Sequence, residues 1–302
     1  MKIISLILSM LTLLAAAYFH NISGNGIPGN IINIASAARQ SAGELSPVNT
    51  GEVSLPVIMY HSVLKDPART GEYVITPAML ESDLKYLSEK GCNAVSPHEI
   101  WEFVSMGTPL PENPVFITFD DGHLNNLTYG RPLMEKYGMR CTVNVVGAFT
   151  LQAEKENDPN PYYAYLTKEN IREMLSSGCF DIGCHTYNMH TLGMRKGAAM
   201  NRGETAEDYA AVLSGDIARW REVTGVSDTL VYAYPFGYYS EEGFEVLAQE
   251  GFRVILTCTE GGNLLSPGNE LSDNSGQGIV KLNRYNRPGF VQTDEFMKRI
   301  GI

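Results

Sequence analysis

From Leu55 to the C-terminus, short apolar and β-branched runs alternate with helix-like segments, and this alternation is the strongest constraint on the fold. Strands that alternate with helices at this spacing pair in parallel, because each helix returns the chain to the same end of the sheet. With seven or eight such units, a closed α/β barrel is favoured over an open sheet. The predicted strands are residues 56–60, 92–95, 115–119, 142–146, 180–183, 230–234, 253–257 and 279–282.

The predicted helices are marked by the residues at their ends. Thr76 is a candidate N-cap with Pro77 in the first turn, and Gly91 follows the last turn of the same helix. Two segments rich in Gly, Asn, Pro and acidic residues, 151–165 and 259–277, are predicted to be long loops over one rim of the barrel. The other predicted helices are residues 126–137, 168–177, 206–223 and 241–250.

The N-terminal segment has a different character. Lys2 precedes an uncharged apolar run over residues 3–19, and a small-residue triplet follows further along the chain. This order predicts a signal peptide or a retained membrane anchor over residues 1–37, a linker over residues 38–51, and one catalytic domain over residues 52–302. We therefore expect an extracytoplasmic protein that is secreted or held at the cell surface, with membrane attachment through residues 3–19 in the second case.

Composition excludes several classes of protein. The 302 residues are 44% hydrophobic and 19% charged, which is typical of a globular chain. The net charge is -11 and no basic stripe offsets it, so a nucleic-acid partner is not expected. No protein partner is inferred. Five cysteines without a CxxC pair indicate neither a zinc knuckle nor a dense disulfide framework, and we interpret them as mostly buried small apolar residues. They are Cys92, Cys141, Cys179, Cys184 and Cys258.

The strand at residues 115–119 ends in two adjacent carboxylates, Asp120 and Asp121, followed by Gly122. The glycine permits a turn that lets both carboxylates face one cavity. One of them can then bind a metal while the other accepts a proton. A solvated Asp-Asp-Gly turn is the alternative, because these residues are common turn formers.

The strand at residues 180–183 leads into a short loop that contains His185 and His190. Histidines five residues apart would lie on different faces of a helix, but a loop at a strand end can bring both imidazoles together. With one carboxylate from the neighbouring motif, they supply Asp, His and His, a common donor set for an open metal site.

A third motif, Tyr234-Pro235-Phe236-Gly237, also follows a predicted strand. Proline fixes φ and glycine frees it, so this turn can aim a backbone N–H into a cavity. As a pattern it is only a turn.

Taken in this order, the motifs resemble the polysaccharide deacetylases of the NodB-homology type, carbohydrate esterase family four. The resemblance covers roughly residues 52–302, and its most specific part is the run Thr118-Phe119-Asp120-Asp121-Gly122. The opening strand 57–61, which ends in Tyr-His, and the five-residue histidine spacing are similar to the branch that includes poly-N-acetylglucosamine deacetylases. The resemblance implies a distorted (β/α) barrel of about seven parallel strands.

The resemblance also implies roles for these residues. Asp120 would be the catalytic base, and the Phe236 backbone N–H, between Pro235 and Gly237, would contribute to an oxyanion site. The implied cofactor is a divalent metal, most often zinc, and the implied substrate is an N-acetylated polysaccharide. The implied metal ligands are Asp121, His185 and His190.

The general acid is where the sequence departs from the family. Many members carry a late Leu-x-His whose imidazole is the acid, but no histidine follows His190 here, and the corresponding stretch is Leu282-Asn283-Arg284. Arginine does not release its proton at ordinary pH, so Arg284 could orient or stabilise a substrate but not serve as that acid. The arginine that usually precedes the Pro-aromatic-Gly turn is also missing.

His61, at the end of the first strand, is a candidate acid or substrate contact, and a structural histidine is the alternative. The remaining histidines, His20, His98 and His123, are interpreted as ordinary loop residues.

These features favour a metal-dependent amidase that removes N-acetyl groups from peptidoglycan, chitooligosaccharide or poly-N-acetylglucosamine. The missing late histidine supports one alternative, a catalytically impaired glycan- or cell-wall-binding protein on the same fold. A third hypothesis is hydrolysis of a small cyclic or linear amide on a related barrel.

Overall fold

The structure is a computed structural model that describes residues 48–49, 51–268 and 278–302. The predicted signal or anchor at residues 1–37 and most of the predicted linker lie outside the described residues. The chain divides into two units, Met1–Ser46 and Pro47–Ile302, and the fold below is that of the second. In the part of the chain that is described, no helix has the length and apolar character needed to cross a membrane.

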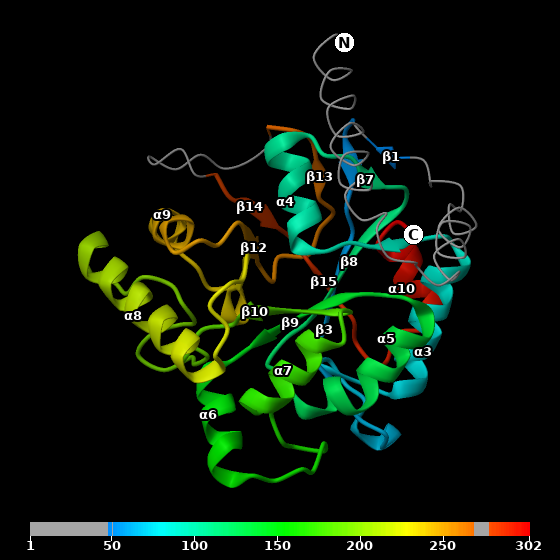
Figure 1. Cartoon of the computed structure of the whole chain (residues 1–302), viewed down its shortest axis with the longest axis horizontal. Helices are drawn as coiled ribbons and strands as arrows, with labels where there is room; N and C mark the ends of the chain where they lie inside the picture. Colours follow the sequence, from blue (N-terminus) through cyan, green and yellow to red (C-terminus); the bar gives the residue numbers. More distant parts are fainter. Residues whose placement is uncertain (1–47, 50, 269–277) are drawn as a thin grey trace, which may run out of the picture. The chain divides into compact units, whose positions relative to one another are not determined.

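A nine-stranded sheet forms the centre of the second unit, and all of its strand pairs are parallel. Figure 1 shows the helices packed around it. The strand order is β14 (Val280–Leu282), β12 (Val254–Leu256), β11 (Val231–Ala233), β10 (Phe180–Cys184), β9 (Cys141–Val145), β8 (Pro114–Phe119), β3 (Val57–Tyr60) and β15 (Tyr285–Asn286), and β6 (Asn93–Ala94) pairs beside them with β8. All eight predicted strands are therefore present.

The two ends of this strand order, β14 and β15, are neighbours in the sequence. Only Asn283 and Arg284 separate them, so the chain itself connects the two edges of the curved sheet. The predicted distorted (β/α) barrel is confirmed, with eight strands in its main order rather than about seven. The prediction missed β15, because a strand of two residues leaves no alternation to detect.

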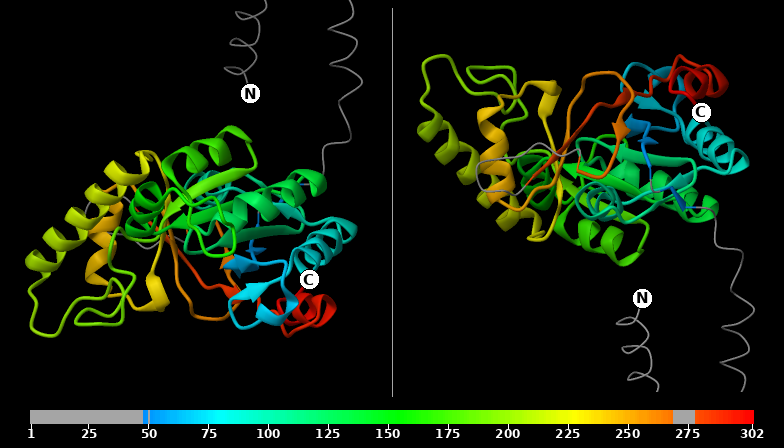
Figure 2. Two further views of the ribbon diagram at one scale, coloured as in Figure 1. Left: turned by 90° about the horizontal axis from the view of Figure 1, so that it is seen from below. Right: turned by 90° about the horizontal axis from the view of Figure 1, so that it is seen from above.

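The helices lie on the outside of the sheet, as the views in Figure 2 show. Thr76 caps the first of them as predicted, since its Oγ1 accepts a hydrogen bond from the Met79 N–H at 3.2 Å. The predicted helices correspond to α3 (Pro77–Glu89), α5 (Arg131–Tyr137) with a preceding π-helical turn (Asn126–Gly130), α7 (Lys168–Ser176), α8 (Ala206–Thr224) and α9 (Glu242–Gln249).

Three helices were not predicted: α4 (Pro97–Met106), α6 (Gly147–Glu156) and α10 (Thr293–Arg299). The predicted loop over residues 151–165 is wrong in its first part, which belongs to α6. This helix starts without a side-chain cap, and its first N–H groups, on Gly147 and Ala148, donate instead to carbonyls of residues 186 and 187. A start signal supplied by a distant loop is invisible in the local sequence.

The remaining short elements border the barrel. They are the antiparallel pairs β1 (Val48–Asn49) with β7 (Leu110–Pro111) and β2 (Val53–Ser54) with β13 (Leu264–Leu265), the parallel pair β4 (Ser62–Val63) with β5 (Val74–Ile75), and the 3₁₀ turns Pro67–Arg69 and Pro235–Gly237.

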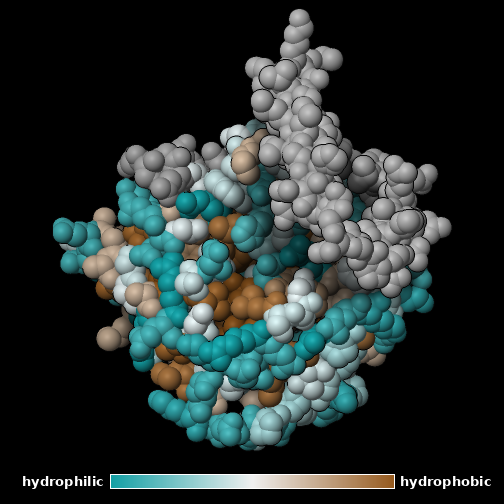
Figure 3. All heavy atoms as spheres, viewed as in Figure 1, coloured by the Kyte–Doolittle hydropathy of each residue, from teal (hydrophilic) through white to brown (hydrophobic). Residues whose placement is uncertain are grey.

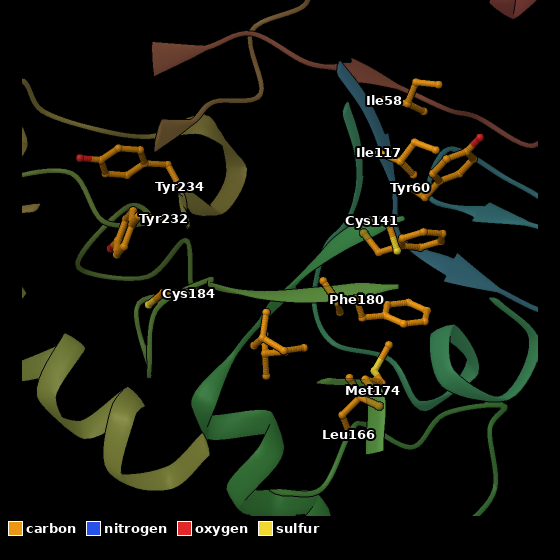
Figure 4. Packing of buried hydrophobic residues seen from close by; sticks show 14 of the residues in the cluster. Ile58, Tyr60, Ile117, Cys141, Leu166, Met174, Phe180, Cys184, Tyr232 and Tyr234 are labelled. Atoms are coloured by element: carbon orange, nitrogen blue, oxygen red, sulfur yellow. The ribbon is translucent and has the colours of Figure 1, made fainter. Parts of the chain in front are cut away.

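The core lies inside the barrel and between the sheet and its helices. Figure 4 shows Ile58, Ile117, Cys141 and Phe180 from successive strands in one cluster of buried apolar side chains. On the face in Figure 3, hydrophilic residues cover most of the outer surface, and hydrophobic residues show in a hollow near the centre.

All five cysteines are free thiols. Cys92, Cys141 and Cys184 are buried as predicted, whereas Cys179 and Cys258 are partly exposed.

Candidate active site

Side chains from the C-terminal ends of β3, β8 and β10 meet in a cavity of about 400 Å³. This is where a parallel barrel places reactive groups. A larger surface groove of about 560 Å³, between α5 and α7, contains none of the predicted site residues. The cavity is lined by Met59, His61, Glu72, Tyr73, Asp120, Asp121, His185, His190, Phe236, Cys258, Glu260 and Asn286.

The Asp-Asp-Gly turn brings two carboxylates to this cavity. Asp121 and Gly122 both have left-handed backbone conformations, with φ of 71° and 73°. Aspartate tolerates this conformation better than most residues, and glycine adopts it without strain. The turn therefore reverses the usual strand alternation, so that Asp120 and Asp121 both line the cavity, as predicted.

Asp121, His185 and His190 form one cluster whose three donor atoms all lie within 4.8 Å of one another. Oδ1 of Asp121 is 3.2 Å from Nε2 of His190 and 3.7 Å from Nε2 of His185. Zinc bonds of about 2.1 Å in tetrahedral geometry place donor atoms about 3.4 Å apart, so the cluster has the size of a zinc site.

The orientation of His185 also suits a metal ligand. Its Nδ1 lies 2.7 Å from the Ala233 carbonyl oxygen, and a hydrogen bond there assigns the proton to Nδ1. Nε2 then presents its lone pair to the cluster, as in metal-ligating histidines. Burial lowers the pKa of His185, so the imidazole stays neutral and available as a donor.

His123, which the sequence suggested was an ordinary loop residue, contacts the other oxygen of Asp121. Its Nε2 is 3.4 Å from Asp121 Oδ2, and its ring stacks on Tyr165. Burial alone would raise the pKa of Asp121, but hydrogen bonds from His123 and His190 hold it well below its usual range. The one sequence signal for this role was that His123 directly follows the Asp-Asp-Gly turn.

Asp120 is 1% exposed and forms a bidentate ion pair with Arg284, whose side chain is fully buried. Nη1 of Arg284 donates to Oδ1 at 2.7 Å, and Nη2 donates to Oδ2 at 2.8 Å. Burial alone would raise the pKa of Asp120, but the Arg284 guanidinium holds it well below its usual range. The carboxylate is therefore ionised and fixed in orientation.

Leu282 and Arg284, the predicted substrate contacts, are both fully buried and do not line the cavity. The Arg284 side chain donates hydrogen bonds to Asp120 and to the Thr257 carbonyl instead of facing the cavity. Leu282 packs in a cluster of buried apolar side chains.

Asn144, at the end of β9, is a site residue that the sequence reasoning missed. Its Nδ2 donates to Asp120 Oδ1 at 2.7 Å. A Cβ on the facing residue, Gly183, would lie 2.1 Å from Asn144 Oδ1, so only glycine leaves room for this side chain. The glycine that ends the Phe-Asp-Ile-Gly strand was the available signal.

His61 lines the cavity, and its ring centroid is 4.7 Å from that of Tyr73. Burial lowers the pKa of His61, although the negative charges of Asp120 and Asp121 oppose the shift. Among the described residues, its Nδ1 has no hydrogen-bond partner. His61 is thus a neutral imidazole with an unused nitrogen, placed beside both carboxylates.

The Pro-aromatic-Gly turn forms one wall of the cavity through Phe236. This residue has φ of 57°, is 42% exposed, and has its ring centroid 4.5 Å from that of His190. Pro235 is buried, and a Cβ on Gly237 would lie 2.9 Å from Cys258 Cβ. Cys258, interpreted from the sequence as a small core residue, also lines the cavity, and Arg284 Nη2 lies 3.8 Å from its Sγ.

Comparison with known proteins supports the resemblance seen in the motifs. Residues 107–255 match the polysaccharide deacetylase family model. The resemblance to polysaccharide deacetylases that the motifs predicted is therefore confirmed over this part of the chain.

Individual relatives are distant. The chain is 26% identical over 208 residues to YxkH of Bacillus subtilis, whose name describes a polysaccharide deacetylase, and the alignment covers 68% of this chain and 65% of that protein. It is 25% identical over 229 residues to the poly-beta-1,6-N-acetyl-D-glucosamine N-deacetylase of Escherichia coli K12, covering 68% of this chain and 34% of that protein. The chain thus spans less than two thirds of either relative.

Solved structures share the fold. The Streptococcus pyogenes deacetylase PplD in complex with acetate superposes with a TM-score of 0.62 at 19% identity, covering 83% of this chain and 99% of that one. IcaB from Ammonifex degensii superposes with a TM-score of 0.62 at 24% identity, covering 82% and 95%. At these identities the likeness establishes the barrel and nothing finer.

Proposed function

We propose that this protein is a metal-dependent hydrolase that removes N-acetyl groups from an extracytoplasmic N-acetylglucosamine-containing glycan and releases acetate. The observation that carries the proposal is the Asp121, His185 and His190 cluster, which lies in one cavity with the ion-paired Asp120. The donor set and its spacing fit a divalent cation, most simply zinc. Such a cation, when bound, supplies a Lewis acid that activates water and polarises the acetyl carbonyl.

Asp120 is the proposed base. Its ion pair with Arg284 keeps it ionised at rest, so it is in the form that accepts a proton. The same ion pair makes its proton affinity low, so a proton taken from water is passed on readily. Asn144 and Arg284 fix the carboxylate, so the base does not have to reorient during the reaction.

His61 is the proposed acid toward the leaving amine. It is neutral at rest, so it must first receive a proton, and Asp120 can pass on the proton that it has taken from water. The Phe236 backbone N–H is the proposed donor to the acetyl oxygen as negative charge develops there. The exposed ring of Phe236 and that of Tyr73 offer faces for a sugar ring at the cavity mouth.

The substrate and the location are inferred from different observations. The name of the E. coli relative supports a poly-N-acetylglucosamine substrate, with chitooligosaccharide and peptidoglycan as the other candidates. The charged start and the apolar run at residues 3–19 support export, with attachment to the membrane if the segment is retained.

The decisive experiment measures acetate release from poly-N-acetylglucosamine, chitooligosaccharide and peptidoglycan. Purified protein should release acetate from at least one of them, lose this activity after chelation, and regain it with added zinc. Binding to a glycan without acetate release would instead favour the impaired, glycan-binding alternative, which the absence of a late histidine supports. Release from a small cyclic amide alone would refute both.

A further inference from the structure

The loop between His185 and His190 is held from outside the cavity by a carboxylate that no sequence motif marks. The N–H of Tyr187 donates to Oδ2 of Asp216 at 2.6 Å, and the N–H of Asn188 donates to Oδ1 at 3.0 Å. Asp216 lies on α8, 26 or more residues beyond the loop, and does not line the cavity. Both of its oxygens are thus committed to the backbone between the two histidines.

The loop is also held by the start of α6. The N–H groups of Gly147 and Ala148 donate to the carbonyls of Thr186 and Tyr187 at 3.0 and 2.7 Å. A Cβ on Gly147 would lie 3.0 Å from the Tyr187 ring and 3.2 Å from Trp220, so glycine is what lets the helix approach the loop this closely.

Between these two supports the loop adopts a strained conformation. Thr186, a β-branched residue that directly follows His185, has φ of 68°, and its Oγ1 accepts a hydrogen bond from the Met189 N–H at 3.1 Å. Such a conformation persists only where the surroundings determine it. The bonds to Asp216 act on the backbone of the two residues midway between the histidines, whereas Arg219 of the same helix lies over the ring of Tyr187.

We propose that Asp216 is a positioning residue that fixes the separation of His185 and His190 and thereby sets the affinity and geometry of the metal site. The inference rests on the proposed function, since it takes the Asp-His-His cluster to be the metal site. Asp216 touches no substrate and no metal ligand side chain in the described contacts. It acts through the backbone of residues 187 and 188.

Substituting asparagine for Asp216 tests the two hydrogen bonds without changing the size of the side chain. Asparagine has the same shape but one acceptor oxygen, and its NH₂ group would face a loop N–H instead of accepting from it. Partners that orient metal ligands typically contribute about 10–100-fold to metal affinity. We therefore expect Asp216→Asn to weaken zinc binding by about 10–100-fold.

The matched control is Glu207→Gln, which removes the same charge from the same helix. Glu207 is exposed in the first turn of α8. Its substitution should leave the zinc dissociation constant within threefold of the parent value. An equal loss of zinc affinity in this control would show that the charge of α8, and not the position of Asp216, affects the metal site. That result would overturn the proposed role of Asp216.

The measurements are zinc dissociation constants by chelator competition and the visible absorption spectrum of the cobalt-substituted protein, both on the full chain. Asp216→Asn should weaken zinc binding more than threefold and change the cobalt band intensities, because the ligand geometry is altered. A purely structural role would lower the thermal unfolding temperature of the metal-free protein but leave both readouts of the folded protein unchanged, and that result would overturn the proposal.

If Asp216→Asn does not fold, Asp216→Ala takes its place in the same assays, because alanine adds no bulk and places no NH₂ group against the loop N–H groups. The zinc affinity of the parent protein tests the proposed function separately. If the parent protein binds no zinc, the metal site itself is refuted. If the parent and the Asp216 variant bind zinc equally tightly, only the positioning role is refuted.

Discussion

Replacing Arg284 with methionine is the most informative single perturbation of this site. Methionine is unbranched and apolar, so it fills much of the space of the arginine stem while removing the guanidinium. Asp120 would then keep the hydrogen bond from Asn144 but lose both bonds from Arg284, at 2.7 and 2.8 Å. The substitution leaves a carboxylate that is 1% exposed without its counter-ion.

The size of the effect follows from this geometry. Removing one partner of a buried ion pair costs about 3–5 kcal/mol of unfolding free energy, because the other charge stays buried and uncompensated. For a domain of this size, 1 kcal/mol corresponds to about 2–4 °C in Tm, so the fall should be about 6–20 °C. Activity of the folded variant on an N-acetyl glycan should fall by about 100-fold or more, because Asp120 is no longer held ionised and in place.

Arg287 provides a matched control in the same part of the chain. It is fully buried and forms a similar ion pair with Asp83, with Nε and Nη2 donating at 2.8 and 3.0 Å, but neither residue lines the cavity. Arg287→Met should therefore destabilise the protein by a comparable amount while leaving kcat/KM of the folded protein within about threefold of the parent value.

The assays are urea unfolding and steady-state acetate release at a temperature where both variants are folded. In the double variant Asp120→Asn, Arg284→Met no unpaired charge remains, so its stability loss should fall short of the sum of the two single losses by at least about 1 kcal/mol. The reasoning is refuted if Arg284→Met loses less than about 1 kcal/mol of unfolding free energy and keeps its activity. It is also refuted if Arg287→Met loses as much activity as Arg284→Met.

Three further predictions concern the metal and the proton transfers. Purified protein should contain about one zinc ion per chain, and both His185→Ala and His190→Ala should lose it by elemental analysis; normal content in both would remove the metal assignment. Asp120→Asn should keep the metal and lose acetate release, whereas Asp121→Asn should lose both, and the reverse pattern would exchange the two roles. His61→Ala should cut turnover of N-acetyl glycan by about 100-fold or more with unchanged metal content, yet hydrolyse an aryl acetate nearly as well as the parent, because that leaving group needs no proton; equal loss on both substrates would place His61 in positioning or folding.

The sequence by itself determined the barrel and the residues at its reactive edge. All eight predicted strands are present. They could be predicted because each is a local apolar run between turn residues, and such a run can be recognised without knowing which strand it pairs with. The proximity of Asp121, His185 and His190 was predictable for the same reason, since each follows a strand and parallel strands bring their C-terminal ends to one edge.

The sequence was less informative where an element takes its stability from distant parts of the chain. The start of α6 is capped by carbonyls of the histidine loop, and β15 is two residues long and exists through its pairing with β3. Neither carries a local pattern, because hydrogen bonds between distant segments leave no periodicity in the segments themselves.

The tertiary structure alone decided how the reactive groups are held. Arg284 lies 164 residues from Asp120, and its place in the family pattern suggested a substrate contact, but closure of the barrel between β14 and β15 directs its side chain to the buried carboxylate. Asp216 is one acidic residue among several on a long helix, and only the packing of α8 against the loop brings its two oxygens to the two N–H groups. Residue types and local spacing identify which groups can react, whereas the ion pairs and backbone bonds that fix them join residues whose separation in sequence carries no information about their separation in space.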